Sequence, residues 1–141
     1  MLNVGAGSGN YEPSDRAVIA IEPSTTMIAQ RPASAAPCVR GVAEALPFDA
    51  ATFDAAMAIL TVHHWTDRAA GMAEMRRVAA RQVVFFFEPA MADDAWIMHY
   101  WPEIRELPTE VDPPGEAAFR ELLDIVDVRP CLLYTSPSPR D

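Results

Sequence analysis

The feature that most constrains this chain is a run of three glycines near its start, in the stretch NVGAGSGN at residues 3–10. A short apolar run at 1–5 leads directly into it, and a glycine turn that binds a ligand needs such a preceding strand. Gly5 would let the strand turn tightly, Gly7 would let the backbone approach a ligand, and Gly9 would allow close packing on the residues directly after it. A flexible N-terminal turn would contain the same glycines, so the choice depends on the rest of the chain.

Apolar runs that are typical of buried strands alternate along the chain with segments of helical spacing. Strands are expected at 1–5, 17–22, 38–43, 53–62 and 82–88, and helices at 25–31 (capped by Ser24), 67–81, 93–107 and 115–126. Continuous apolar strands separated by other elements favour a parallel sheet covered on both faces. The predicted fold class is α/β, a Rossmann-like doubly wound and mostly parallel sheet.

Composition restricts the size of the protein and its partners. A chain of 141 residues with 50% hydrophobic content can form one compact domain. Its net charge of −9 repels phosphate backbones and anionic lipid, so neither nucleic acid nor a membrane is expected as a partner. Two cysteines, Cys38 and Cys131, provide neither a disulfide framework nor a metal-ligand cluster. We therefore expect a cytoplasmic protein without a metal site.

An acidic residue ends the second predicted strand and supports a cofactor site. The carboxylate of Glu22 could accept hydrogen bonds from both hydroxyls of a ribose, and such a ligand-facing group is expected to lie outside the core. Glu22 follows Gly9 by 13 residues, whereas about 20 are expected in the dinucleotide-binding fold. Residues 10–16 therefore leave room for only a turn or a very short helix.

Five stretches of the sequence resemble, in order, the motifs of class I S-adenosylmethionine-dependent methyltransferases: LNVGAGSG, AIEPSTTMI, VRGVAEALPF, FDAAMAILTVHHWTD and AEMRRVA. The branch they resemble is the type 11 group, to which the ubiquinone and menaquinone biosynthesis C-methyltransferases are similar. The likeness runs from Leu2 to about Pro89. It implies S-adenosylmethionine as cofactor, with the glycine turn under its amino-acid part and the acid of the second strand on its ribose. The cofactor-binding residues that it implies are Gly5, Gly7, Gly9, Glu22, Pro23, Val42, Ala43, Ile59 and Leu60.

The sequence departs from that pattern in several places. The family usually has Asp where this chain has Asn3, and Asp or Asn where it has Val42. Valine cannot hydrogen-bond the adenine amine, so the backbone at Ala43 would have to recognise it. Each lost polar contact would cost roughly 0.5–1.5 kcal/mol, which weakens binding without removing it. The helix after the glycine turn is shortened, and a usual Pro-Gly-Gly turn before the fifth strand is replaced by AARQ.

The acceptor side of the resemblance rests on the HHW stretch at 63–65. His63 or His64 could act as a general base with a pKa near working pH. Alternatively, the histidines and the tryptophan pack against the next helix, and catalysis works by positioning alone. The stretch WIMHYW at 96–101 could line an acceptor pocket, or it could be the apolar face of an ordinary helix.

The resemblance implies methyl transfer to a small-molecule acceptor, and two other functions stay open. One is a catalytically silent relative that binds the cofactor or only a protein partner, an interpretation that Asn3 and Val42 support. The other is a dinucleotide-dependent oxidoreductase, which the GVAEALPF stretch disfavours.

The chain is expected to be a fragment whose sheet is incomplete at both ends. Residues 1–130 are expected to be a partial methyltransferase domain, with a sixth strand that begins at 126–130. Residues 131–141 resemble translated adapter sequence, and a natural disordered tail would have a similar composition.

Overall fold

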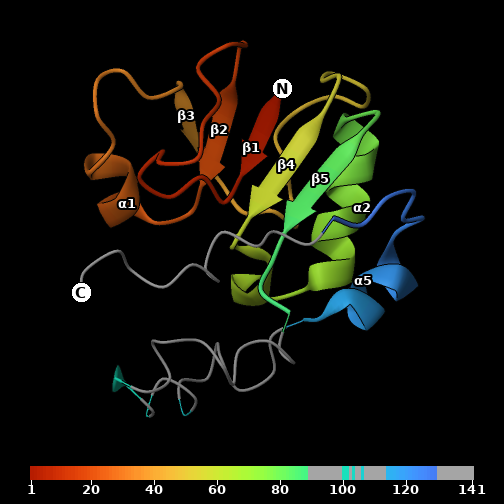
Figure 1. The fold of residues 1–141 in the computed structure, drawn as a ribbon. Helices are drawn as coiled ribbons and strands as arrows, with labels where there is room; N and C mark the ends of the chain where they lie inside the picture. Colours follow the sequence, from red (N-terminus) through yellow and green to blue (C-terminus); the bar gives the residue numbers. More distant parts are fainter. Residues whose placement is uncertain (89–99, 102, 104–105, 107–113, 130–141) are drawn as a thin grey trace.

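The computed structural model describes residues 1–88, 100–101, 103, 106 and 114–129. Its centre is a five-stranded sheet in the order β3-β2-β1-β4-β5 (Figure 1). All pairings between these strands are parallel. The predicted doubly wound α/β fold is therefore confirmed, and the strands are β1 (Leu2–Val4), β2 (Ile19–Glu22), β3 (Cys38–Arg40), β4 (Ala56–Ile59) and β5 (Gln82–Phe85).

The strand order reverses between β1 and β4. From β1 the chain builds outward through β2 to β3, and it then returns so that β4 pairs with the other edge of β1. Leu2 of β1 accordingly lies opposite both Ile19 and Ala56. In open α/β sheets, ligands bind outside the carboxyl ends of the strands at such a reversal. The residues that come directly after β1 and β4 meet at that edge.

One face of the sheet is covered by α2 (Arg68–Val78), which packs behind β4 and β5 (Figure 1). Its fully buried residues Met72, Met75 and Val78 join the core residues of β1, β2 and β4. The helix α5 (Glu116–Leu122) adds Phe119, whose ring centroid lies 4.4 Å from that of Phe86. Burial of these apolar side chains is the main force that holds the domain together.

Two helices begin at side-chain caps. Ser24 caps α1 (Thr25–Ala29) by accepting a hydrogen bond from the N–H of Met27, as expected from the sequence. Asp67 caps α2 by accepting from the N–H of Ala70 at 2.9 Å. Each cap satisfies a backbone donor that the helix cannot pair internally. The caps therefore fix the starts of both helices locally.

Several elements end earlier than expected. The strand expected at 53–62 is reduced to β4, because Leu60 has a φ of +52° and the chain then forms a 3₁₀ turn, η1 (Val62–His64). A left-handed backbone conformation cannot continue a strand. The helix expected at 67–81 stops at Val78, because Ala79 is extended and bridges Phe53. Residues 10–18, all of which are described, form no helix, as expected.

The strand expected to begin at 126–130 is wrong for its described part. Residues 126–129 form no strand and pair with none of the described strands, and Val126 is 99% exposed. A strand needs a partner for its backbone groups, and this segment lacks a ladder in the described part of the chain. The tail at 131–141 and nearly all of the helix expected at 93–107 lie outside the described residues.

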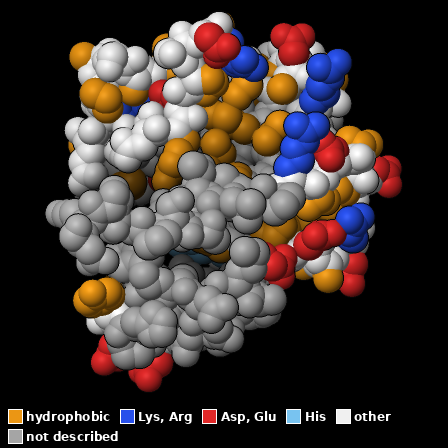
Figure 2. Space-filling model, viewed as in Figure 1, with side chains coloured by type: hydrophobic (Ala, Val, Ile, Leu, Met, Phe, Trp, Pro, Cys, Tyr) orange, Lys and Arg blue, Asp and Glu red, His pale blue; other side chains and the backbone are white. Residues whose placement is uncertain are grey.

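Apolar side chains also occupy the face of β5 that points away from α2. Val84 and Phe86 pack against the core, so the alternating residues Val83, Phe85 and Phe87 lie on the opposite face. Val83 and Phe87 are more than half exposed. Figure 2 shows hydrophobic side chains gathered over the strands on the side that it displays. The strand is thus apolar on both faces, as the uninterrupted hydrophobic run in the sequence indicates.

Candidate functional site

A cavity of about 700 Å³ opens where the strand order reverses. Its walls come from the turn after β1, the end of β2, the loop after β3 and the segment after β4. It brings together most residues that the sequence predicted for cofactor binding. Those that line it are Gly5, Gly7, Glu22, Pro23, Val42, Ala43, Ile59 and Leu60, and His64 lines it as well. Gly9 and His63 are not part of the lining.

The glycine turn has a left-handed backbone at Gly5 (φ +69°), Gly7 (φ +55°) and Gly9 (φ +92°). A Cβ atom on Gly5 would lie 2.0 Å from Oγ1 of Thr61, so this glycine lets the ends of β1 and β4 touch. A Cβ atom on Gly7 would meet only the end of the Met27 side chain, at 3.3 Å. Gly7 therefore leaves backbone exposed to the cavity, as the sequence predicted.

Gly9 has a different neighbour from the one expected. A Cβ atom there would lie 3.1 Å from Cβ of Ala35 and 3.3 Å from Nη1 of Arg31. Gly9 thus packs against the segment after α1 rather than against the residues directly after the glycine turn. Its role is to support the turn from behind, because it does not line the cavity.

Glu22 ties the glycine turn to the start of α1. Its Oε2 accepts a hydrogen bond from the N–H of Gly7 at 2.8 Å, and its Oε1 accepts one from the N–H of Ser24 at 2.9 Å. The residue is only 7% exposed, so the expectation that it lies outside the core is wrong. Burial is tolerated because both carboxylate oxygens have backbone donors. A carboxylate accepts about four hydrogen bonds, so these two use half of its capacity.

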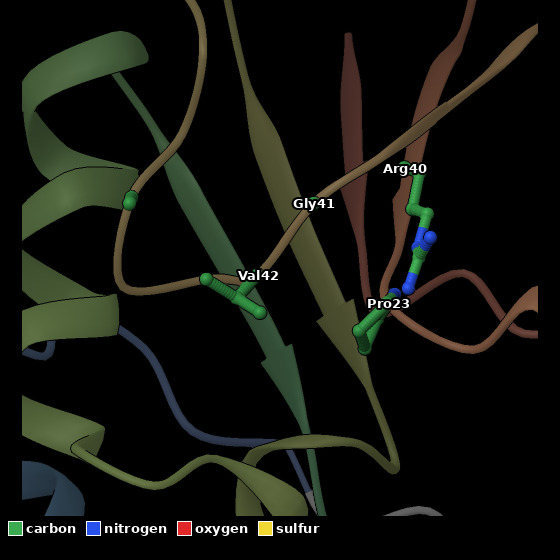
Figure 3. A pocket seen from close by; sticks show the side chains of 5 residues that line it. Pro23, Arg40, Gly41 and Val42 are labelled. Carbon is green, nitrogen blue, oxygen red and sulfur yellow. The ribbon is translucent and has the colours of Figure 1, made fainter.

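A second, open hollow of about 430 Å³ adjoins the main cavity. Pro23 and Val42 line both, and Arg40, Gly41 and Ala45 complete the smaller one. Figure 3 shows the side chain of Arg40 beside Pro23, and Val42 on the loop after β3. Val42 is 45% exposed and presents only methyl groups. This part of the wall therefore offers apolar contact and backbone groups, not a side-chain acceptor.

The loop after β3 is held by its own polar residues and by α2. Glu44 accepts hydrogen bonds through Oε1 from the N–H groups of Thr66 and Asp67 at 2.8 and 3.1 Å. Glu74 of α2 accepts from the N–H of Leu46 at 2.9 Å, and Arg77 donates to the carbonyl of Leu46 at 3.0 Å. The AEALPF stretch, which the resemblance associates with adenine, is thus a loop fastened on both sides.

The Glu74–Arg77 pair makes part of this fastening dependent on pH. Arg77 donates two hydrogen bonds to Glu74, at 2.6 and 2.8 Å, and thereby lowers the pKa of Glu74 below its usual value. A carboxyl group with a lowered pKa stabilises the folded state above its unfolded-state pKa of about 4.3 and stops doing so as pH falls through its folded-state pKa.

We therefore expect Glu74→Gln to lower the free energy of unfolding by about 0.5–1 kcal/mol near pH 7, since Glu74 is partly exposed. The difference from wild type should shrink as pH falls below about 4.3. Urea unfolding across that pH range measures it. Glu121→Gln, on α5, serves as the control variant, and an equal difference at all pH values would contradict the assignment.

The HHW stretch serves both of the uses considered for it. The rings of His63 and His64 lie with their centroids 3.9 Å apart, and only His64 lines the cavity. Trp65 lines the cavity too, and it packs on Gly71 of α2, where a Cβ atom would lie 2.4 Å from the ring. The packing of the tryptophan against the next helix is therefore confirmed.

Some residues of the lining carry no clear signal in the sequence and were not predicted. They include Asn10, Tyr11, Met27, Thr61 and Thr66. Thr61 has no local signal, because its place is set by the contact with Gly5 across two strands. Tyr11 comes shortly after the glycine run, and its nearness to that run is a signal that could have found it.

Two kinds of feature are absent from the described residues. No helix in the described ranges has the length and apolar character needed to cross a membrane. The described residues also contain no group of three His, Cys, Asp or Glu side chains placed to hold a metal ion.

The sequence matches the model of a known domain family, described as a methyltransferase domain, over residues 2–87. No curated protein matches the sequence significantly. Among solved structures, a protein from Anabaena variabilis described as a methyltransferase from an antibiotic biosynthesis pathway is 27% identical, with a TM-score of 0.69 over 80% of this chain and 48% of its own. A SAM-dependent methyltransferase from Thermotoga maritima is 18% identical, with a TM-score of 0.68 over 86% of this chain and 59% of its own.

The YcgJ protein from Bacillus subtilis is 22% identical, with a TM-score of 0.63 over 86% of this chain and 58% of its own. The chain thus spans between about half and three fifths of the length of these structures. The family model covers more than half of this sequence and contains the whole sheet and the cavity-lining residues. The chain therefore belongs to the methyltransferase domain family.

Proposed function

We propose that this chain binds S-adenosylmethionine in the cavity at the strand reversal and transfers its methyl group to a small-molecule acceptor. The observation that carries the proposal is the pairing of Gly7 with Glu22 at one cavity wall. Gly7 leaves room for a ligand to approach the backbone, and Glu22 places a carboxylate beside it. The volume of about 700 Å³ lies within the range of about 300–1,000 Å³ that small-molecule sites have.

The proposed roles of the lining residues come from their positions. The remaining acceptor capacity of Glu22 suits the hydroxyls of a ribose. Val42 and Ala43 would contact the adenine, and the adjoining hollow beside Pro23 extends that wall. Ile59 and Leu60, at the end of β4, would border the methionine portion. Gly5 shapes the turn, and Gly9 supports it from behind.

The chemistry supplied by S-adenosylmethionine is an activated sulfonium methyl group, so the protein has to align donor and acceptor and exclude water. Trp65 and Thr61 close the cavity on the side of β4. His64 lies on the same side and is the candidate general base for an acceptor that must lose a proton. The net charge of −9 supports a small molecule rather than a nucleic acid as acceptor.

A catalytically silent, cofactor-binding relative is the second candidate. The observation that favours it is Val42, which offers no hydrogen bond where the family usually has a polar side chain. A methyl-transfer assay over a panel of metabolites separates the two candidates. Transfer to any member of the panel supports the enzyme, and cofactor binding without transfer supports the silent relative.

The cofactor itself is tested by calorimetric titration of the chain with S-adenosylhomocysteine and with NAD. We expect S-adenosylhomocysteine to bind and NAD not to bind. Glu22→Ala should weaken the binding of S-adenosylhomocysteine by about 1.5–3 kcal/mol, because it removes hydrogen bonds to a charged group. Asp15→Ala, at an exposed carboxylate in the loop before β2, is the matched control.

Because Glu22 is buried and bonded to two backbone groups, Glu22→Gln is included as a milder variant that keeps one acceptor oxygen. A thermal melt of each variant separates loss of the site from loss of the fold. Unchanged affinity in a folded Glu22→Ala variant, or binding of NAD alone, would contradict the proposal.

A further inference from the structure

A buried ion pair joins two loops behind the glycine turn. Glu12 lies between the turn and β2, and Arg31 lies just after α1. Their side chains form an ion pair and are only 8% and 6% exposed. The pair formed by Arg16 and Asp15, in contrast, is 68% exposed at Asp15 and 56% exposed at Arg16. Burying two charges costs several kcal/mol unless further hydrogen bonds satisfy them, so such a pair needs a structural reason.

The further hydrogen bonds are all to backbone. Nη1 of Arg31 donates to the carbonyl oxygen of Gly7 at 3.0 Å, and Nη2 donates to Glu12 and to the carbonyl oxygen of Ala36 at 2.9 Å. The second oxygen of Glu12 accepts from the N–H of Ala36 at 2.7 Å. The guanidinium thus spans from the glycine turn to the segment after α1, and Glu12 holds it in that orientation.

Gly7 is consequently held at both of its backbone polar groups. Glu22 accepts from its N–H, and Arg31 donates to its carbonyl. The space beside Nη1 of Arg31 is also the space that a side chain on Gly9 would need. Neither Arg31 nor Glu12 belongs to the described lining of the cavity, so both act through the turn and not on a ligand directly.

The need for such a contact comes from the local chain. In doubly wound folds, a helix usually comes after the glycine turn and holds its backbone. Here residues 10–18 form no helix. A rigid guanidinium with several donors can replace that support, because it bonds to two carbonyls and a carboxylate at once.

We propose that Arg31, oriented by Glu12, is a positioning residue that sets the conformation of Gly7 at the cavity and thereby the affinity for the cofactor. This inference rests on the proposed function for its ligand. Its structural part, the control of Gly7 by Arg31, can be measured without any ligand.

The variants are Arg31→Ala, Arg31→Lys and Glu12→Gln, with Arg16→Ala as the matched control on an exposed arginine. We expect Arg31→Ala to weaken the binding of S-adenosylhomocysteine by at least about tenfold, as the loss of charge-assisted hydrogen bonds predicts. Arg31→Lys keeps the charge but not the fork, so it should restore little. Glu12→Gln should fall between wild type and Arg31→Ala, and Arg16→Ala should match wild type.

Chemical rescue separates positioning from a merely structural role. Guanidinium ion at millimolar, non-denaturing concentrations should restore part of the affinity of Arg31→Ala and leave that of Arg16→Ala unchanged. Hydrogen exchange gives a readout that needs no ligand. The amide of Gly7 should exchange faster in Arg31→Ala, whereas core amides such as those of Met75 and Val84 should not change.

Unchanged affinity together with unchanged exchange at Gly7 in a folded Arg31→Ala variant would overturn the inference. So would faster exchange throughout the core without rescue by guanidinium, which would mean general destabilisation. If wild type does not bind S-adenosylhomocysteine, the proposed function fails. In that case faster exchange confined to the glycine turn still supports positioning of Gly7 by Arg31, and unchanged exchange overturns it.

Discussion

Gly7→Val is expected to abolish binding of S-adenosylhomocysteine at concentrations that saturate the wild-type chain. Gly7 lines the cavity, and on the protein side only the tip of Met27 lies near the position of a Cβ atom. A branched side chain would therefore project into the space that the ligand needs. Calorimetric titration measures the loss, which should exceed the loss in Glu22→Ala because the ligand is excluded rather than deprived of one partner.

The backbone at Gly7 has a φ of +55°, so any side chain adds strain of about 1–2 kcal/mol. Gly7→Ala carries that strain with a single extra carbon and is the matched control. It should lower the melting temperature about as much as Gly7→Val and weaken binding less. Normal binding by a folded Gly7→Val variant would show that the glycine run is only a turn.

Gly5→Ala is expected to lower the free energy of unfolding by about 2–5 kcal/mol, from the strain of a positive φ and from overpacking. Its φ is +69°, and a Cβ atom would overlap Thr61, with Oγ1 at 2.0 Å and Cβ at 2.8 Å. Domains are stable by only about 5–15 kcal/mol, so the variant should be close to unfolding. Urea unfolding followed by circular dichroism measures the change.

Two companion variants make that test specific. Gly41→Ala adds a methyl group where φ is not positive and the nearest atom, Cδ1 of Ile21, is 3.3 Å away, so it should cost little. Thr61→Gly removes all of the atoms that the new methyl group would meet, so in the Gly5→Ala background it should restore part of the stability. An unchanged urea midpoint for Gly5→Ala would mean that β1 and β4 do not meet as described.

The positions of the strands were largely predictable, whereas their ends were not. Apolar runs located all five strands because burial on both faces of a parallel sheet requires them. The end of β4 depends on Leu60, whose φ of +52° is set by the loop that it enters and not by its own preference. Leucine gives no local warning of a left-handed conformation, so the sequence predicted a strand that continues into η1.

Gly71 shows the same limit inside a helix. By propensity alone a glycine there is unfavourable by about 1 kcal/mol relative to alanine. Its reason is the ring of Trp65, which occupies the place of the missing side chain. The periodicity of α2 predicted the helix but could not reveal the contact, because the tryptophan belongs to a different element.

Local chemistry by itself determined the alternation of strands and helices, the cap at Ser24, the turn at the glycines and the acid at the end of β2. These features depend on backbone sterics and on neighbours within a few residues, which a linear pattern contains. Only the tertiary structure decided that Glu22 holds the N–H of Gly7 and that Arg31 holds its carbonyl. These partners are 15 and 24 residues from Gly7, and the order of strands in the sheet, not sequence distance, brings them together.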